Sequence, residues 1–194
     1  LLYAAALCND ASERMVDGVR QVVGDSTEGA LLVAASEAGI SKDELERLFP
    51  RVAEIPFDSA SKRMVTVHSV SSAALDLALP LGGMGQGERF AVAKGAVDVL
   101  LPLCSHVSQA VVMERVAALA SSGMRVLACA GCRVEADWSP DDGAAPRELA
   151  FMGLIAMMDP PRPEARDAVE RCARAGIRPV MITGDHPATA RAIA

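Results

Sequence analysis

Aromatic residues are scarce in this sequence, at 3% of its 194 residues. The apolar volume comes instead from Ala, Val, Leu and nine Met, and hydrophobic residues make up 51% of the chain against 23% charged residues. This balance is typical of a globular protein with a buried core. Because an aromatic side chain is a rare choice here, we expect any exposed one to have a function.

An excess of positive charge is also missing. The formal net charge is −6, and no stretch of five or six basic residues occurs. The sequence therefore lacks the electrostatic footprint of a nucleic-acid-binding protein, and we expect no nucleic-acid partner. An anionic ligand would have to bind through a locally placed Lys or Arg.

Long hydrophobic runs are absent as well. The longest, residues 1–7, is far shorter than the roughly 20 residues that cross a bilayer, and it has no basic segment before it. The five cysteines are an odd number without a regular framework, which favours a reducing compartment. These features predict a soluble, cytosolic chain with no direct membrane contact.

Two of the cysteines, Cys129 and Cys132, form a C-x-x-C pair. They lie in an apolar run that predicts a buried strand, where positions three apart point to opposite faces. A single metal ion could not easily bind both thiols. We favour burial as small hydrophobic side chains over a redox or metal site, and we predict no metal ligands in the chain.

The pattern of the first 158 residues predicts an α+β domain, an antiparallel sheet flanked by helices. We expect helices over 1–8, 27–38 (capped by Ser26 or Thr27), 42–48, 96–103 and 108–122. We expect strands over 51–56, 63–70, 73–79, 88–93 and 125–133. The glycine-rich residues 81–87 lack the Gly-Lys-Ser/Thr ending of a phosphate-binding loop, so we interpret them as a hairpin turn.

A different pattern follows from residue 148. An apolar strand over 148–158 leads to Asp159, and then a helix, a glycine and a strand over 177–182 follow in order. This alternation is typical of a parallel, Rossmann-like α/β unit. We therefore predict a domain over 1–158 and part of a second, Rossmann-like domain over 159–194.

The triplet Thr183-Gly184-Asp185 comes directly after the predicted strand over 177–182 and before a helix. Open parallel sheets bind ligands at this place, and backbone N–H groups with the Thr183 hydroxyl could hold a phosphoryl group. The same triplet also suits an ordinary turn.

Seven short motifs occur in a characteristic order. They are Ala6-Leu7-Cys8-Asn9-Asp10, Gly24-Asp25-Ser26-Thr27-Glu28-Gly29-Ala30-Leu31, Ile55-Pro56-Phe57-Asp58-Ser59 with Lys62 and Met64, Lys94-Gly95-Ala96, Arg125-Val126-Leu127-Ala128, Asp159-Pro160-Pro161-Arg162 and Thr183-Gly184-Asp185. Over nearly the whole chain, this series resembles the nucleotide-binding domain of P-type ATPases, in the branch of calcium and sodium/potassium pumps, followed by part of their phosphorylation domain.

The resemblance implies an ATP site. Phe57 would stack on adenine, which is worth about 1–3 kcal/mol per base, and Glu28 would accept a hydrogen bond from the adenine amino group. Lys94 would lie along the nucleotide between a strand and a helix, where Gly95 lets the ligand approach the backbone. Met64 would line the site. The structural alternatives are core packing for Phe57 and Met64, a solvated strand end for Lys94 and a capping box for Glu28.

Lys62 and Arg125 would supply positive charge near the phosphates. The planar guanidinium group of Arg125 can bridge two phosphate oxygens. Thr183, Gly184 and Asp185 would contact the phosphate. Asp159, Pro160, Pro161 and Arg162 match the family's hinge between the two domains, and the tandem prolines make it stiff. One departure is that Val97-Asp98 follows the Lys-Gly-Ala segment, where the family usually has Pro-Glu.

In a pump of this family, ATP phosphorylates an aspartate that would lie upstream of residue 1, and the Mg²⁺ ligands would also lie outside this sequence. The resemblance therefore implies a cytoplasmic part of an integral membrane protein of the cell membrane, which binds ATP without turnover. Its partners would be the remaining phosphorylation domain, the actuator domain and the transmembrane domain of the same pump. The motifs favour calcium as the transported ion.

Two other classes remain as alternatives. A soluble phosphatase of the haloacid-dehalogenase type shares the α/β unit but needs an Asp-x-Asp motif after a strand near its start, and none is present. The other is a non-catalytic interaction module, which would bind no nucleotide.

Overall fold

The computed structural model describes residues 1–74, 83–140, 146–158 and 162–182. The chain forms two compact units. The first, here called the sheet unit, comprises Leu1–Gln109 and Leu127–Ile155, and the second unit comprises Ala110–Val126 and Ala156–Ala194.

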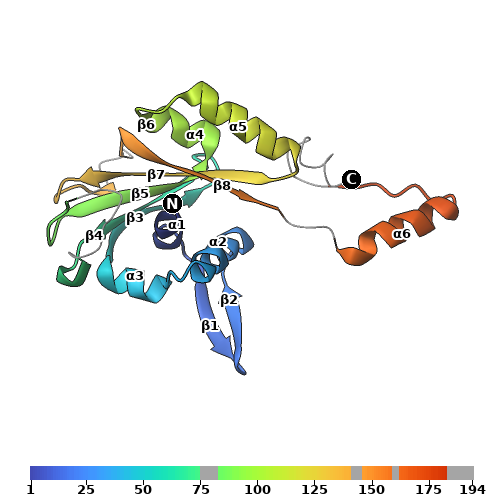
Figure 1. Cartoon of the computed structure of the whole chain (residues 1–194), viewed down its shortest axis with the longest axis horizontal. Coiled ribbons are helices and arrows are strands. Elements are labelled where there is room, and N and C mark those ends of the chain that lie inside the picture. The colour runs from blue at the N-terminus through green and yellow to red at the C-terminus, as the bar shows by residue number, and fades with distance from the viewer. Residues whose placement is uncertain (75–82, 141–145, 159–161, 183–194) are drawn as a thin grey trace. The chain divides into compact units, whose positions relative to one another are not determined.

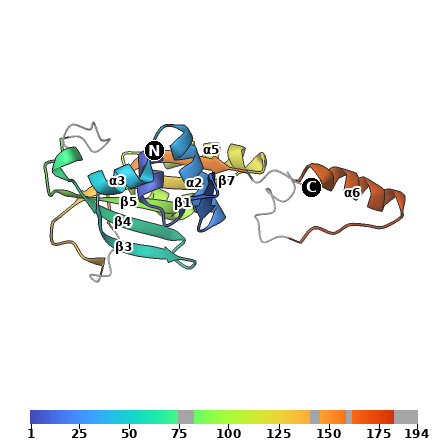
Figure 2. The same ribbon diagram turned by 90° about the horizontal axis from the view of Figure 1, so that it is seen from below.

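A six-stranded, mostly antiparallel sheet forms the frame of the sheet unit, with the strand order β3-β4-β5-β7-β8-β6 (Figures 1 and 2). The strands are β3 (Arg51–Asp58), β4 (Arg63–Ser69), β5 (Arg89–Ala96), β6 (Cys104–Ser105), β7 (Arg125–Val134) and β8 (Leu149–Met157). β3, β4, β5 and β7 pair antiparallel, and β6 pairs with β8 in parallel. The predicted mixed fold with an antiparallel sheet is confirmed.

Helices lie on both faces of this sheet. Figure 1 shows α1 (Leu2–Leu7), α2 (Ser26–Glu37) and α3 (Lys42–Leu48) on one side, and α4 (Val97–Leu100) with the 3₁₀ turn Leu101–Leu103 on the other. The five inner residues of β4 are buried, whereas the edge strand β3 alternates between half-buried and exposed positions. β4 is thus covered on both faces, whereas the edge strand β3 is only partly covered.

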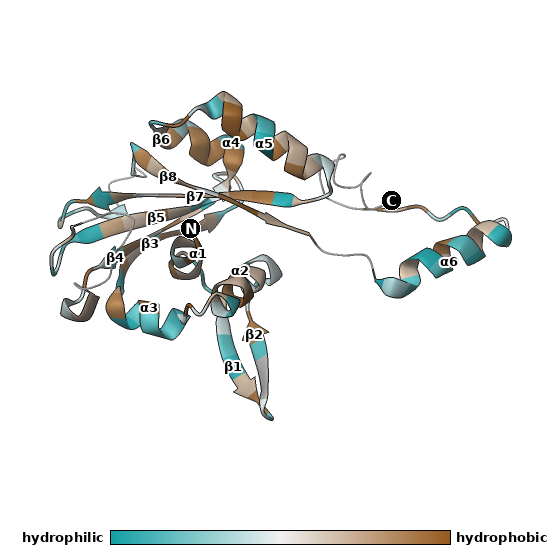
Figure 3. Cartoon of the chain, in the orientation of Figure 1, coloured by the Kyte–Doolittle hydropathy of each residue, from teal (hydrophilic) through white to brown (hydrophobic). Residues whose placement is uncertain are grey.

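Two of the phenylalanine side chains, Phe49 and Phe90, lie in the core of the sheet unit. Phe49 meets Phe90 edge to face with ring centroids 5.7 Å apart, and the His68 ring stacks on Phe90 at 5.5 Å. The predominantly hydrophobic colour of β4, β5 and β7 in Figure 3 marks the same region. This core holds the strands on which the candidate site is built.

Helix α2 begins one residue earlier than its sequence predicts. Asp25 is its N-cap, and the Asp25 carboxylate accepts hydrogen bonds from the backbone N–H groups of Thr27 (2.8 Å) and Glu28 (3.3 Å). The predicted caps, Ser26 and Thr27, are instead the first two helical residues. Aspartate is among the strongest N-cap residues, and it competes successfully with its Ser and Thr neighbours here.

A hairpin of β1 (Ser12–Val16) and β2 (Val19–Val23) was not predicted. Its turn residues Asp17 and Gly18 have φ of 51° and 78°. An Asp-Gly pair with both φ values positive is typical of a two-residue type I′ hairpin turn. The signal was therefore present in the sequence.

Strand β5 continues beyond its predicted end at residue 93. Lys94 and Gly95 lie within the strand, because β4 continues to pair with them through Met64 and Arg63. The prediction that Lys94 stands between a strand and a helix is therefore wrong, and the helix begins only at Val97.

The loop regions of the sheet unit match their predictions only in part. Residues 72–74 form a 3₁₀ turn where the start of a strand over 73–79 was expected, and residues 75–82 lie outside the described part of the chain. In the described part of the glycine-rich segment, Gly83 and Gly87 have φ of 62° and 82°. Positive φ at two glycines agrees with a turn.

Two helices lie in the described residues of the second unit. They are α5, over Gln109–Ser121 and belonging to this unit from Ala110 on, and α6 (Pro163–Arg174), which has Pro163 in its first turn. Both helices were predicted. The strand expected over 177–182 is not formed, and Ile177 and Ile182 are 59% and 94% exposed. A strand exists only by hydrogen bonding to a neighbour, and apolar composition alone does not supply one.

No helix within the described ranges is both long and apolar enough to cross a membrane.

Candidate functional site

A buried ion pair joins β5 to the start of α2. Lys94 Nζ lies 2.7 Å from Glu28 Oε1, and the two side chains are only 8% and 16% exposed. Burying two charges costs desolvation free energy, which is offset only where the geometry is good and further hydrogen bonds are made. We therefore take this buried ion pair as the centre of the candidate functional site.

The second carboxylate oxygen of Glu28 is also bound. Glu28 Oε2 accepts a hydrogen bond from the backbone N–H of Asp10 at 2.9 Å. The Glu28 backbone carbonyl accepts another from Asn9 Nδ2, also at 2.9 Å. The carboxylate thus reaches across to the turn after α1 and to β5, and it does not close a capping box on its own helix.

Asn9 holds this turn together and is fully buried. Besides the Glu28 carbonyl, Asn9 Nδ2 contacts the Ala5 carbonyl at 3.3 Å, and Asn9 Oδ1 accepts from the Ala11 N–H at 2.9 Å. Its side chain therefore links α1, the turn and α2. A buried amide with all of these partners stabilises one conformation of the turn.

Two cations bind the carbonyl groups of the same turn. Lys42 Nζ donates to the carbonyls of Asn9 (2.7 Å) and Ala11 (2.6 Å). Arg51 donates to the Asn9 carbonyl at 2.8 Å and to the Asp10 carboxylate at 2.7 Å. These bonds satisfy carbonyl groups of the turn that follows α1.

The surroundings of Lys94 within the sheet are apolar or neutral. Met64 and Cys129 are its register partners on β4 and β7, and all three side chains share a face of the sheet. Met64 is 1% exposed. Cys8 lies near this face, with its Sγ 3.6 Å from the Met64 carbonyl.

Both thiols near Lys94 are neutral at physiological pH. Burial raises the pKa of Cys8 to about 11 and that of Cys129 to about 12, although the Lys94 charge acts in the opposite direction. The ion pair of Lys94 with Glu28 thus lies beside neutral thiols. In the C-x-x-C motif, Cys129 is buried against Lys94, while Cys132 is half-buried and pairs with Ala91.

Phe57 lies near the end of the edge strand β3 and is 63% exposed. The alternative of core packing is therefore wrong for this residue. The next residue, Asp58, accepts hydrogen bonds from the N–H groups of Ala60 (3.1 Å) and Ser61 (2.8 Å), and these bonds hold the pKa of its carboxyl below the usual range. The turn after Phe57 is thus held by Asp58.

Lys62 ends this turn with φ of 48°, and its side chain is exposed. Its carbonyl accepts a hydrogen bond from the Ala96 N–H at 3.0 Å. A Cβ atom at Gly95 would lie 2.5 Å from that same carbonyl oxygen. Gly95 is therefore required by the close approach of two backbones, whatever else it does for a ligand.

The structure brings Glu28, Met64, Lys94 and Gly95 together and places Phe57 and Lys62 on the neighbouring strand ends. Arg125 is the first residue of β7 and belongs to the second unit. Arg162 is exposed and precedes α6. The other predicted hinge and phosphate residues, Asp159, Pro160, Pro161, Thr183, Gly184 and Asp185, lie outside the described residues.

Sequence reasoning missed the roles of Asn9, Lys42 and Arg51. A usable signal existed for Asn9, because it is the only asparagine in the chain and it follows directly on a helix. For Lys42 and Arg51 we find no such signal, because the groups of this turn that they bind lie more than 30 residues away in the sequence.

The fold and the site define a mixed α/β domain with a polar site on one face of an antiparallel sheet. Residues 1–164 match the family model of the P-type ATPase cytoplasmic domain N. The chain belongs to this family of P-type ATPases, membrane proteins of which domain N is a cytoplasmic part. The predicted family and cytoplasmic location are thus confirmed.

Curated relatives agree with this assignment. Over its whole length the chain is 37% identical to calcium-transporting ATPase 1 of Bacillus cereus and 40% identical to probable cation-transporting ATPase F of Mycobacterium tuberculosis, and it covers 21% of each. It is 36% identical to the sodium/potassium exporting P-type ATPase cta3 of Schizosaccharomyces pombe, of which it covers 18%. The chain thus spans about a fifth of the length of these relatives.

Proposed function

We propose that the sheet unit binds ATP and, within a cation pump, presents the γ-phosphate to an aspartate outside this sequence. The observation that carries the proposal is the buried Lys94–Glu28 pair on a sheet whose edge strand ends in an exposed Phe57. Membership of the P-type ATPase family supplies the class of reaction.

The adenine ring would stack on Phe57. An exposed aromatic side chain offers a flat apolar face, and few other side chains in this chain could do so. Phe57 lies where the register of β3 against β4 shifts, between Ile55, which pairs with Val65, and Asp58, which pairs with Arg63. The ring is exposed at this irregularity of the edge strand.

The phosphates would bind positively charged side chains. Lys62, at the end of the turn after Phe57, is exposed and free to reach an anion. Arg125 is our second candidate, because its guanidinium can bind two phosphate oxygens at once. We further propose Thr183, Gly184 and Asp185 as phosphate contacts and 159–162 as a hinge between domains 1–158 and 159–194, the latter part of a Rossmann-like phosphorylation domain.

Transfer of the γ-phosphate in this class of enzyme depends on positioning and on neutralisation of charge by Mg²⁺. Within the described ranges, no three His, Cys, Asp or Glu side chains are grouped in a way that could hold a metal ion. As the resemblance to these pumps implies, we propose that the Mg²⁺ ligands, like the phosphorylated aspartate, lie outside this sequence. The chain by itself would bind ATP without turning it over.

The transported ion is a separate proposal. Two of the relatives named above are called calcium-transporting and sodium/potassium exporting, so the family includes pumps for different cations. We propose calcium, because the Ile-Pro-Phe-Asp-Ser and Gly-Asp-Ser-Thr-Glu-Gly-Ala-Leu segments resemble those of calcium pumps. Ion selectivity is determined by membrane-spanning segments, which lie elsewhere in such a pump.

Titration of ATP into the isotope-labelled 194-residue chain tests the proposal, with NMR shifts as the readout. We expect shifts at Phe57, Lys94 and Glu28. Phe57→Ala should weaken binding by about tenfold, since stacking on one aromatic ring is worth about 1–3 kcal/mol. Val52→Ala, on the same strand and also exposed, is the matched control and should bind ATP normally.

Two results would contradict the proposal. An absence of shifts at millimolar ATP would favour a non-catalytic interaction module. Release of phosphate from p-nitrophenyl phosphate by the chain alone would favour a phosphatase of the haloacid-dehalogenase type.

A further inference from the structure

The peptide group between Asn9 and Asp10 is bonded on both of its sides. Its carbonyl oxygen accepts from Lys42 Nζ at 2.7 Å and from Arg51 Nη2 at 2.8 Å. Its N–H donates to Glu28 Oε2 at 2.9 Å. This peptide bond is trans, and the C=O and N–H of a planar trans peptide point in opposite directions. Two cations therefore lie on one side of the peptide, and the Glu28 carboxylate lies on the other.

The three charged side chains around this peptide are largely shielded from water. Lys42, Arg51 and Glu28 are 13%, 23% and 16% exposed. Partly buried charges are screened less than exposed ones, and hydrogen bonds in series polarise one another. The two cations thus orient the N–H of Asp10 and also strengthen it as a donor to Glu28.

The position of Lys42 is unfavourable for the helix on which it lies. Lys42 is the first residue of α3, where a positive charge opposes the helix dipole. The carboxylate of Glu46 lies 3.5 Å from Nζ and is 49% exposed, so this ion pair contributes little. The two shorter bonds of Lys42 run to the carbonyls of Asn9 and Ala11, on either side of Asp10. Lys42 therefore serves the turn after α1 more than it serves α3.

The Glu28 carboxylate has room for a further donor. A carboxylate has about four acceptor sites, and Lys94 Nζ at Oε1 and the Asp10 N–H at Oε2 occupy two of them. The resemblance to P-type pumps implies that the adenine amino group is the further donor. Because a hydrogen bond weakens steeply as its angle narrows, binding of the amino group depends on the orientation in which the carboxylate is held.

We propose that Lys42 and Arg51 are positioning residues for recognition of the base. By binding the carbonyl between Asn9 and Asp10, they aim the Asp10 N–H at Glu28 and hold the carboxylate in the orientation that receives the adenine amino group. This inference deepens the proposed function and rests on it. Its consequence is that loss of either cation lowers the preference for a purine with an amino group, while the triphosphate still binds.

Comparison of ATP with purine riboside triphosphate, which lacks only the amino group, tests this consequence by calorimetry. The wild-type 194-residue chain should prefer ATP by more than about threefold, because the second nucleotide loses one hydrogen bond, and a smaller preference would overturn the proposal. In Lys42→Met, which keeps the aliphatic stem and loses the ammonium, this preference should fall by more than about twofold through weaker binding of ATP. An unchanged preference, whether both affinities fall together or neither falls, would overturn the proposal.

Two further variants separate positioning from general effects on folding and charge. Arg51→Met removes the second cation from the same carbonyl, so it should lower the preference in the same direction even if Lys42→Met does not fold. Arg47→Met, at an exposed position in the last turn of α3, makes the same change of net charge and should keep the wild-type preference. An equal fall in Arg47→Met would show an effect of net charge alone and would contradict the proposal.

A double-mutant cycle tests whether Lys42 acts through Glu28. Glu28→Gln has one acceptor oxygen in place of two, and we expect it to lose most of the preference. In that background Lys42→Met should lower the preference no further, and an undiminished further loss would contradict the proposal. If the wild-type chain binds neither nucleotide, the proposed function fails and this inference falls with it. If it binds both and the preference does not depend on Lys42 or Arg51, only this inference fails.

Discussion

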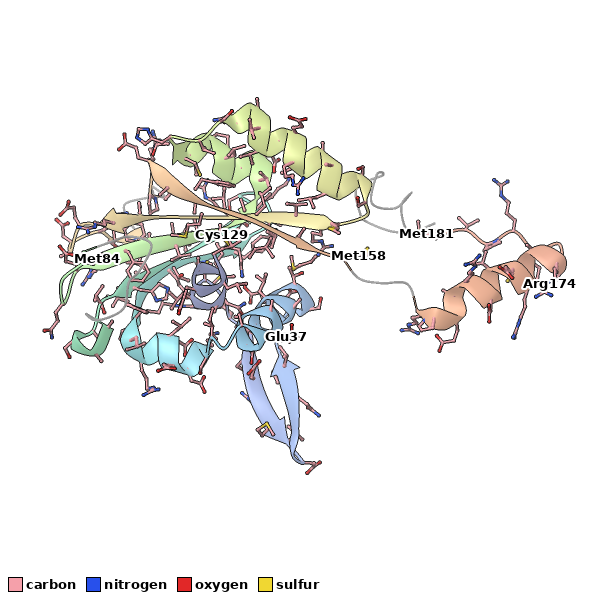
Figure 4. All side chains as sticks on the ribbon, in the orientation of Figure 1. Glu37, Met84, Cys129, Met158, Arg174 and Met181 are labelled. Atoms are coloured by element: carbon pink, nitrogen blue, oxygen red, sulfur yellow. The ribbon has the colours of Figure 1, made fainter. Side chains whose placement is uncertain are left out.

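Lys94, in the sheet unit, is a charged residue that is 6% exposed, whereas Ile182, after α6, is an apolar residue that is 94% exposed. Lys94 is buried with a counter-ion at 2.7 Å. Ile182 belongs to a stretch without a strand or helix, and no residue of α6 is buried. Figure 3 shows the same contrast in colour between the inner strands and α6, and Figure 4 shows Cys129 on the sheet, Arg174 on α6 and Met181 after it.

The difference shows that burial in this chain follows from available partners more than from residue type. Asn9 and His68 are polar and fully buried because backbone and side-chain groups accept or donate to each of them. Ile177 and Val180 are apolar and exposed, because in their own stretch there is no strand for them to join. Three predictions test this contrast.

The largest effect should come from acidifying the buried histidine. His68 Nδ1 lies 2.9 Å from the Phe49 carbonyl and must donate to it, so Nε2 accepts from the Thr66 hydroxyl at 2.8 Å. Burial lowers the pKa of His68 to about 4, and the Arg51 charge acts in the same direction, although the bond to Phe49 opposes it. The neutral ring therefore belongs to the folded state.

Below the ordinary histidine pKa of about 6.5, the unfolded chain takes up a proton that the folded chain does not. The stability from His68 is thus fully present above about pH 6.5 and is lost as pH falls towards 4, by about 3 kcal/mol in all. Urea unfolding between these pH values should show the loss. His68→Gln, which does not titrate, should have a shallower slope, and an equal slope in both proteins would contradict the prediction.

A smaller effect should follow from adding one methyl group to the sheet. Gly95→Ala puts a Cβ 2.5 Å from the Lys62 carbonyl oxygen and 2.8 Å from Arg63 Cα, which are backbone atoms that cannot move aside alone. We expect a loss of about 2 kcal/mol in the free energy of unfolding, measured in urea.

The matched control for this change is Gly85→Ala, where the nearest atom to the new Cβ is Glu88 Cδ at 4.0 Å. It should change stability by less than about 0.5 kcal/mol. Similar losses of stability in the two variants would show that the backbone at Gly95 lies farther from Lys62 and Arg63 than in the structure.

The smallest effect should come from α6. Arg166 Nε lies 3.5 Å from Glu170 Oε1, but the two side chains are 87% and 57% exposed. Arg166→Ala should change the free energy of unfolding by less than about 0.5 kcal/mol, because exposed ion pairs of this spacing contribute little. A loss of 2 kcal/mol or more, by the same urea measurement, would show that α6 has a partner in solution and would break the contrast between the two regions.

Much of the sheet unit could be predicted from local pattern. Lys42–Leu48 forms a helix as expected, and the runs predicted as strands around residues 51–58, 63–69 and 125–134 form strands. The Asp17-Gly18 hairpin was missed although its turn signal was present. The strand over 177–182 was predicted on composition and is wrong, because composition does not show whether a neighbouring strand exists.

The candidate site was predictable only as a set of residues. Motif order was sufficient to single out Glu28, Phe57 and Lys94, and the family that this order indicated is confirmed. Their roles in nucleotide binding stay predictions. Local pattern ended β5 at residue 93, and only the pairing with β4 places Lys94 inside the strand.

By itself, the sequence determined the family, through the order of its motifs, and the mixed α/β class and the positions of most helices and strands, through local pattern. Only the tertiary structure decided that Glu28 is bound by Lys94, 66 residues away, and that Asn9 and Arg51 hold the turn beside it. The physical reason is that a buried charge is stable only with its partners, and folding brings those partners together from distant segments.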